Sequence, residues 1–170
     1  MKKWICIIML TMLAGMLSAC GGSSETVKDE SGSVDFTVEL ASGQDFTLSE
    51  QKGKVVFINL WASWCGPCVR ELPALCDLYE HYKDDEEVVI LAINQGESQK
   101  ALDKFVEEKG YSIPVAYDHT SKLGKLFEQD SIPVTMIFDK DGNLFDTVIG
   151  APMDTSGLCD KYVEIIDGLK

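Results

Sequence analysis

The stretch KVVFINLWASWCGPC, residues 54–68, decides the fold. Residues 54–61 are almost continuously apolar and rich in β-branched side chains, as in a strand that is covered on both faces. The motif WCGPC, residues 64–68, then opens a segment whose apolar residues follow the three-to-four spacing of a helix, Cys65–Tyr82. The stretch therefore predicts a buried strand that leads into a helix with two cysteines in its first turn.

The position of the two cysteines predicts a redox role. A thiol attacks a disulfide only as the thiolate, and the first turn of a helix offers Cys65 free N–H groups and the positive end of the helix dipole. Cys68 lies one turn further on, where it can resolve a mixed disulfide formed by Cys65. Pro67 suits this turn because its missing N–H has no helical partner there. We expect Cys65 as nucleophile, Cys68 as resolving cysteine, and their disulfide as the redox group without a separate cofactor.

The rest of the chain alternates strand-like and helix-like segments. Further buried strands are expected at 88–93 and 134–138, and further helices at 98–109, 121–128 and 154–169. This alternation predicts an α/β fold with parallel crossovers. A turn-rich segment, 139–143, joins two antiparallel neighbours, and residues 35–40 and 45–48 form an N-terminal β-hairpin. The expected sheet is therefore mixed, with helices on both faces.

The first residues have the pattern of an export signal. A positive start is followed by an uncharged apolar run, 4–17, which is short for a membrane span of about 20 residues. The following Leu17-Ser18-Ala19-Cys20 resembles the lipobox of bacterial lipoproteins, which implies lipidation of Cys20. We therefore expect a signal peptide at 1–19, a flexible tether at 20–33 and a folded domain at 34–170. A plain signal peptide with an incidental cysteine and an uncleaved anchor remain alternatives.

Composition limits the partners and the compartment. The formal charge of −13 excludes the basic footprint that a nucleic-acid partner needs. The chain has 6 cysteines among 170 residues, a content that suits a compartment where disulfides persist. We therefore expect an extracytoplasmic protein, lipid-anchored to a bacterial cell membrane.

Three motifs together resemble one family. Residues 59–68 (NLWASWCGPC), 92–98 (AINQGES) and 132–135 (IPVT) are similar to the active-site stretch, the insert and the cis-proline loop of extracytoplasmic thioredoxin-fold thiol-disulfide oxidoreductases of the ResA-like and TlpA-like kind. The resemblance covers 34–170 and implies a thioredoxin-like fold and a cis bond before Pro133. It also implies the residues that contact the substrate, namely Trp64, Gly66, Pro67, Ile132 and Pro133.

One departure from cytoplasmic thioredoxins directs attention to Glu71. Those proteins carry a buried aspartate where this chain has Asn59, which cannot titrate. Glu71 follows Cys68 by one turn and matches a glutamate that ResA-like proteins place beneath their cysteines. We expect burial to raise its pKa and Glu71 to manage the proton of Cys68. A solvated surface glutamate is the alternative.

The remaining cysteines and the histidines predict no metal site. Cys76 and Cys159 are expected on helices that cover the same face of the sheet. They form either a disulfide or two buried thiols, and the thiols are favoured because cysteine is a common core residue. No second CxxC and no close histidine pair suggests zinc. His81 and His119 lie in polar surroundings and are expected at the surface.

The predicted function is reduction of disulfides in exported proteins, with a membrane thiol carrier as electron donor. The Gly66-Pro67 dipeptide is that of thioredoxin, which is a reductant. For a ResA-like protein the implied client is apocytochrome c, whose paired cysteines must be reduced before haem attachment. An oxidase of exported proteins and an electron donor to an extracytoplasmic methionine sulfoxide reductase or peroxidase remain alternatives. A lipoprotein binding module without turnover is disfavoured, since both cysteines are present.

Overall fold

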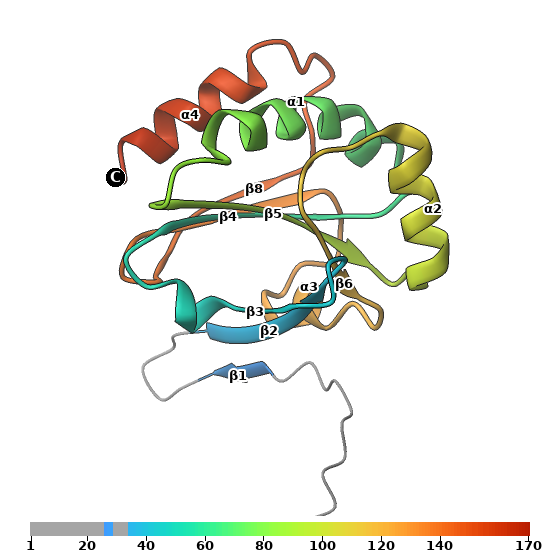
Figure 1. The fold of residues 1–170 in the computed structure, drawn as a ribbon, viewed down its shortest axis with the longest axis horizontal. Coiled ribbons are helices and arrows are strands. Elements are labelled where there is room, and N and C mark those ends of the chain that lie inside the picture. The colour runs from blue at the N-terminus through green and yellow to red at the C-terminus, as the bar shows by residue number, and fades with distance from the viewer. Residues whose placement is uncertain (1–25, 29–33) are drawn as a thin grey trace, which may run out of the picture.

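The computed structural model describes residues 26–28 and 34–170 (Figure 1). The expected signal peptide, the lipidation at Cys20 and most of the expected tether lie outside these residues. Thr26–Lys28 falls within the tether region and forms a short strand, β1, paired with β2. In the described part of the chain, no helix has the length and apolar character needed to cross a membrane.

The centre of the fold is one mixed sheet. Its strands are β1 (Thr26–Lys28), β2 (Val34–Leu40), β3 (Asp45–Thr47), β4 (Val55–Trp61), β5 (Val88–Gln95), β6 (Val115–Asp118), β7 (Val134–Phe138) and β8 (Leu144–Ile149). The order is β1-β2-β6-β5-β4-β7-β8, with β3 paired to β2. Strands β4, β5 and β6 are parallel, whereas β7 and β8 are antiparallel to their neighbours. The mixed sheet and the N-terminal hairpin, β2–β3, are both confirmed.

Helices cover both faces of this sheet, as predicted. They are α1 (Gly66–Tyr82), α2 (Gln99–Lys109), α3 (Lys122–Leu126) and α4 (Leu158–Asp167), and a 3₁₀ turn spans Leu48–Gln51. Helices α1, α2 and α4 pack on one face, and α3 packs on the other together with apolar residues of the hairpin (Figure 1). Each face therefore has its own apolar core.

Strand β4 positions the site because its side chains alternate between the two faces of the sheet. All of its side chains are buried, and successive side chains of a strand point to opposite faces. Phe57 and Trp61 belong to the core beneath α1, whereas Ile58 and Leu60 belong to the core beneath α3. Asn59 lies between Phe57 and Trp61 in this pattern. Its amide therefore points toward α1, the helix that carries both cysteines.

Helices α3 and α4 and strand β6 differ from the sequence prediction. Helix α3 is shorter than 121–128 because Ser121 and Glu128 have φ values of 52° and 58°, which an α-helix cannot contain. Helix α4 starts at Leu158 instead of 154, after Gly157 with φ of 75°. Strand β6 was not predicted, because it is only four residues long and follows a proline.

Candidate active site

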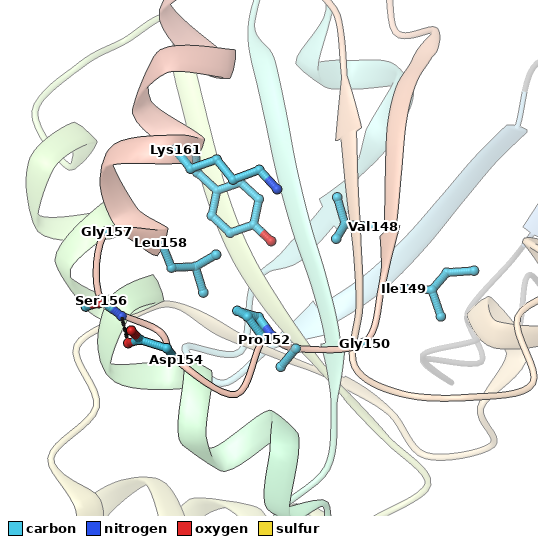
Figure 2. A pocket seen from close by; sticks show the side chains of 11 residues that line it. Val148, Ile149, Gly150, Pro152, Asp154, Ser156, Gly157, Leu158 and Lys161 are labelled. Atoms are coloured by element: carbon cyan, nitrogen blue, oxygen red, sulfur yellow. Dashed lines mark hydrogen bonds between the residues drawn. The ribbon is translucent and has the colours of Figure 1, made fainter.

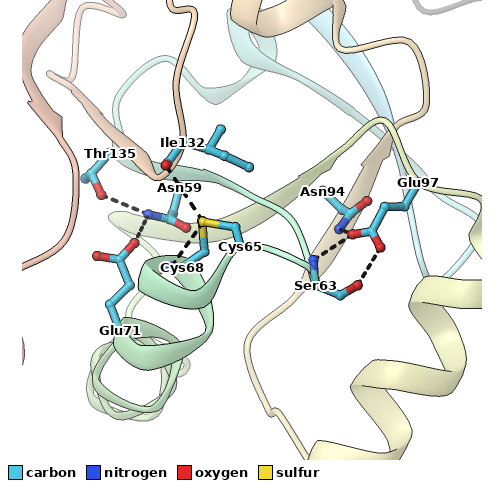
Figure 3. Close-up of a disulfide and its surroundings, with 9 residues drawn as sticks. All are labelled: Asn59, Ser63, Cys65, Cys68, Glu71, Asn94, Glu97, Ile132 and Thr135. Atoms are coloured by element: carbon cyan, nitrogen blue, oxygen red, sulfur yellow. Dashed lines mark hydrogen bonds between the residues drawn. A yellow bond between two sulfur atoms is a disulfide. The ribbon is translucent and has the colours of Figure 1, made fainter.

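Cys65 ends the loop after β4 and is the N-cap of α1. Its extended backbone marks the start of the helix, and its Sγ accepts a hydrogen bond from the backbone N–H of Cys68 at 3.3 Å. Cys65 and Cys68 form a disulfide with their Cα atoms 5.3 Å apart (Figure 3). An N–H donor and a helix N-terminus both stabilise negative charge on sulfur, so the geometry favours Cys65 as a thiolate once the disulfide is reduced.

The two sulfur-bearing residues differ in accessibility. Cys65 is 6% exposed, whereas Cys68 is fully buried. Around Cys65, Trp64 is 72% exposed, and Gly66 and Pro67 are exposed as well. An incoming disulfide can therefore reach the sulfur of Cys65 first, with these three residues as the surrounding surface.

The loop before β7 lies against the disulfide. The Ile132–Pro133 peptide bond is cis, as the resemblance implied. The carbonyl oxygen of Ile132 lies 3.7 Å from Cys65 Sγ. Pro133 is buried, and its own carbonyl accepts a hydrogen bond from the N–H of Gly150 at 2.8 Å. The loop thus holds the backbone of Ile132 next to the attacking sulfur.

Glu71 is buried one turn below Cys68. Only 1% of its surface is exposed, so it is not a solvated helix residue. Asn59 Nδ2 donates to Glu71 Oε1 at 2.9 Å and to Thr135 Oγ1 at 3.0 Å. Burial raises the pKa of Glu71 to about 7, although the hydrogen bond from Asn59 and the charge of Arg70 act in the opposite direction. Glu71 can therefore take up or release a proton near neutral pH.

Asn59 lies between this carboxyl group and the sulfur atoms (Figure 3). Its Nδ2 donates both of its hydrogens, to Glu71 and Thr135, but its Oδ1 is buried without a hydrogen-bond partner. An unpartnered buried acceptor costs about 1–3 kcal/mol. Oδ1 of Asn59 is therefore expected to accept a hydrogen bond when the neighbouring cysteines change their redox state.

A cavity of about 490 Å³ lies between the end of β8 and the start of α4 (Figure 2). It is lined by apolar groups such as Val148, Ile149 and Leu158, with Lys161 and Tyr162 on the helix side. The hydroxyl of Tyr162 lies 3.4 Å from Thr135 Oγ1. A chain of hydrogen-bonding groups therefore connects this cavity through Thr135 and Asn59 to Glu71.

Glu97 holds the loop that leads into the active site. Its carboxylate accepts hydrogen bonds from the backbone N–H of Ser63 at 2.7 Å, from the Ser63 hydroxyl and from Asn94 Nδ2 at 2.7 Å. Burial alone would raise the pKa of Glu97, but these hydrogen bonds outweigh burial and lower it. The carboxylate thus ties the end of β5 to the residue before Trp64.

Glu97→Gln is expected to destabilise the fold by about 2 kcal/mol, since an amide has only one acceptor oxygen for the three donors that meet there. The urea midpoint at pH 7 measures this loss. Glu108→Gln is the matched control, because Glu108 is exposed and pairs with Lys104 along α2. Equal midpoints for the two variants would show that Glu97 does not hold the loop.

The other candidates lie away from the disulfide. Cys76 and Cys159 are both half-buried free thiols, not a disulfide. Burial, followed by the charges of Asp77 and Asp160, raises the pKa of Cys159, which makes it a poor nucleophile. His81 and His119 are exposed, as expected.

Sequence reasoning missed Glu97, Thr135 and Gln95 as parts of the site. A signal for two of them exists in the sequence. Polar residues follow the apolar run of β5 directly, and the carboxyl ends of parallel strands meet at one edge of a sheet. Glu97 and Gln95 could thus have been placed near Cys65, which follows the neighbouring strand. Thr135 lies inside a buried strand and carries no such signal.

Comparisons with known proteins agree with this geometry. Residues 32–146 match the AhpC/TSA family. The thiol-disulfide oxidoreductase ResA of Bacillus subtilis is 30% identical over 88% of this chain and 82% of its own length. Among solved structures, StoA of Bacillus subtilis has a TM-score of 0.63 and 26% identity, over 74% of this chain and 94% of that one. The exposed lipoprotein thioredoxin of Streptococcus pneumoniae has a TM-score of 0.62 and 30% identity, over 76% and 98%.

Proposed function

This chain is a thiol-disulfide oxidoreductase of the AhpC/TSA family, and on that premise we propose that it reduces disulfides in exported proteins while lipid-anchored outside the cytoplasm. The observation that carries the proposal is the placement of Cys65. Its sulfur is the accessible member of the pair, caps α1 and lies 3.7 Å from the Ile132 carbonyl. This is the arrangement needed to bind a substrate backbone and attack its disulfide.

The reaction transfers two electrons to the substrate in two exchanges. The Cys65 thiolate attacks one substrate sulfur, forms a mixed disulfide and releases the other substrate sulfur as a thiolate. Cys68 then loses its proton and attacks Cys65 Sγ, which forms the Cys65–Cys68 disulfide and releases the second substrate sulfur. A membrane thiol carrier returns the pair to the dithiol state.

Glu71 manages the proton of Cys68 in this scheme. A carboxyl group with a pKa of about 7 is matched to proton transfer at neutral pH. Asn59 holds this carboxyl group by one hydrogen bond and keeps an open acceptor, Oδ1, on the side of the sulfur atoms. In the dithiol state, a thiol hydrogen would supply the donor that Oδ1 lacks.

The substrate surface in this proposal consists of the exposed residues around Cys65 and of the cis-proline loop. Trp64, Gly66 and Pro67 form the first part, and Ile132 and Pro133 form the second. The substrate backbone pairs with Ile132 as an added strand. The motif resemblance to ResA-like proteins implies apocytochrome c as a client, so we include it among the proposed clients.

Membrane attachment in this proposal is through Cys20. The lipobox resemblance supports it, and a similar solved structure is that of an exposed lipoprotein. Two or three acyl chains give a durable anchor, because each buried methylene adds about 0.8 kcal/mol of membrane affinity.

The reduction potential of the Cys65–Cys68 pair tests the direction of electron flow. We expect a value near that of thioredoxin, about −270 mV, when the full-length protein in detergent is equilibrated with dithiothreitol buffers. A Cys76→Ser variant, which keeps the active-site pair, is the control. It shows that the thiols measured at each potential belong to Cys65 and Cys68. A value near that of DsbA, about −120 mV, would make the protein an oxidase of exported proteins instead.

A further inference from the structure

A second cavity, of about 320 Å³, opens beside the disulfide on the α3 side of the sheet. We call it the α3 pocket, and its lining includes Leu60, Trp64, Gln95, Gly124, Lys125 and Ile132. Leu60 belongs to the core beneath α3, whereas Asn59 and Glu71 lie on the α1 side. The α3 pocket is therefore separate from the proton-managing groups.

The amide of Gln95 has a fixed orientation in this pocket. Both carboxylate oxygens of the buried Asp118 accept backbone N–H groups, from Lys122 at 2.9 Å and Leu123 at 2.8 Å. Gln95 Nε2 donates to Asp118 Oδ2 at 3.0 Å. Because a carboxylate only accepts, the nitrogen of Gln95 must face Asp118, and its carbonyl oxygen must face the other way.

Among the hydrogen bonds of the described residues, none is donated to Gln95 Oε1. This oxygen is not one of the enclosed side-chain atoms without a partner, which are Asn59 Oδ1 and Trp61 Nε1, so it is open to the pocket. A substrate donor would replace water at Oε1, and such a hydrogen bond contributes about 0.5–1.5 kcal/mol. The α3 pocket thus presents one pre-oriented hydrogen-bond acceptor.

Gly124 keeps the space in front of this acceptor open. A Cβ atom at this position would lie 3.5 Å from Gln95 Oε1 and 3.1 Å from the backbone oxygen of Gln129. A side chain at position 124 would therefore occupy space next to Oε1.

The α3 pocket also borders the place where substrate is attacked. Trp64 directly precedes Cys65, and the carbonyl oxygen of Ile132 lies 3.7 Å from Cys65 Sγ. Both residues line the pocket. Side chains of a strand point alternately to its two sides, so a peptide paired with Ile132 directs residues next to its cysteine toward this cavity.

We propose that the α3 pocket is a specificity subsite that binds one side chain of the substrate protein, and that this side chain ends in an N–H donor for Gln95 Oε1. The inference rests on the proposed function, because it needs a peptide bound at Ile132. Lys125 and Asp130 also line the pocket and bring one charge of each sign. The net charge of the pocket therefore does not select the side chain that binds there. The hydrogen bond to Gln95 Oε1 selects it.

The test compares disulfide-containing peptides that differ at one position, scanned over two residues on either side of the attacked cysteine. At one of these positions, wild-type protein is expected to reduce the glutamine peptide with a kcat/KM about tenfold above that of the isosteric methionine peptide. Lysine should likewise exceed norleucine. A preference at none of the scanned positions would overturn the inference.

Three variants test whether Gln95 Oε1 causes the preference for a side chain with an N–H donor. Gln95→Met keeps the length of the side chain and removes the acceptor, so the preference is expected to disappear. Gly124→Ala keeps both partners of the bond between Gln95 and Asp118 and places a Cβ atom 3.5 Å from Oε1, where it excludes a donor, so it should also abolish the preference. Lys125→Met changes the same pocket without touching the acceptor and should keep it. A preference that survives in both Gln95→Met and Gly124→Ala would contradict the assignment.

Reduction of oxidised glutathione reports whether each variant is folded and active. It should be unchanged in Gly124→Ala and Lys125→Met. The preference of each variant is a ratio between two peptides, so a general loss of activity in Gln95→Met does not alter it. Failure of the proposed function looks different: wild type and Cys65→Ser would then reduce every peptide equally slowly. Equal, Cys65-dependent reduction of all peptides would refute only the subsite.

Discussion

Cys68→Ser is expected to accumulate substrate as a mixed disulfide on Cys65, whereas Cys65→Ser is expected to form no such adduct. The reason is the order in which the sulfurs can react. Cys65 is accessible and receives an N–H from the Cys68 backbone, whereas Cys68 is fully buried behind it. Without Cys68, the first exchange still occurs but the second cannot. Turnover should fall by a factor on the order of 10³ or more in both variants.

The measurement is mass spectrometry of unreduced protein after incubation with a disulfide-containing peptide. The dithiol form is prepared first with dithiothreitol, which is then removed. Cys76→Ser serves as the control, since Cys76 is half-buried and free, and this variant should turn over like wild type. An adduct on Cys68 in the Cys65→Ser variant would reverse the assigned roles.

The sequence was sufficient for the layout around the cysteines. The apolar run of β4 and the helical spacing after Cys65 are local patterns, and each is strong enough to predict its element alone. Successive side chains of β4 point to opposite faces of the sheet. The sequence therefore also allowed the prediction that Asn59 faces a partner on the helix. Glu71 was therefore found from spacing and from resemblance together.

Other parts of the site depend on contacts between distant segments. Thr135 meets Asn59 only because β7 pairs with β4 in one particular register. Gln95 acquires its orientation from Asp118, which lies on the next strand, β6. Strand β6 itself is too short for a period-two pattern to be recognised. Register and short strands are properties of the assembled sheet, so local sequence does not predict them.

Glu71 is expected to make the fold less stable as the pH rises. Its ordinary pKa of 4.5 applies to the unfolded chain, and burial raises the pKa in the folded protein to about 7. Between these values the folded state holds a proton that the unfolded state has lost, so the free energy of unfolding falls with increasing pH. The stabilisation is complete below pH 4.5 and is lost as the pH passes through about 7. The full change is about 3 kcal/mol, because each unit of pKa difference corresponds to about 1.4 kcal/mol.

Glu71→Gln is expected to remove this loss, because an amide of the same shape never ionises. Its oxygen can still accept the hydrogen bond from Asn59 Nδ2. Relative to wild type, the variant should therefore gain about 3 kcal/mol of stability between pH 4.5 and pH 8. Urea unfolding of the oxidised proteins across this range measures the difference, and the comparison cancels the titration of all other carboxyl groups.

Glu80→Gln on the same helix is the matched control for this pH dependence. Glu80 is exposed, and its hydrogen bond with Lys83 lowers its pKa, so its own contribution to stability changes below pH 4.5 and outside the tested window. A constant difference between wild type and Glu71→Gln from pH 4.5 to 8 would mean that the Glu71 carboxyl group does not titrate there. Glu71 could then not exchange a proton with Cys68 at neutral pH, and the resolving step would need another base. A difference that grows with pH would instead show that the fold maintains a destabilising buried carboxyl group next to its redox pair, as expected for a group retained for proton transfer and not for stability.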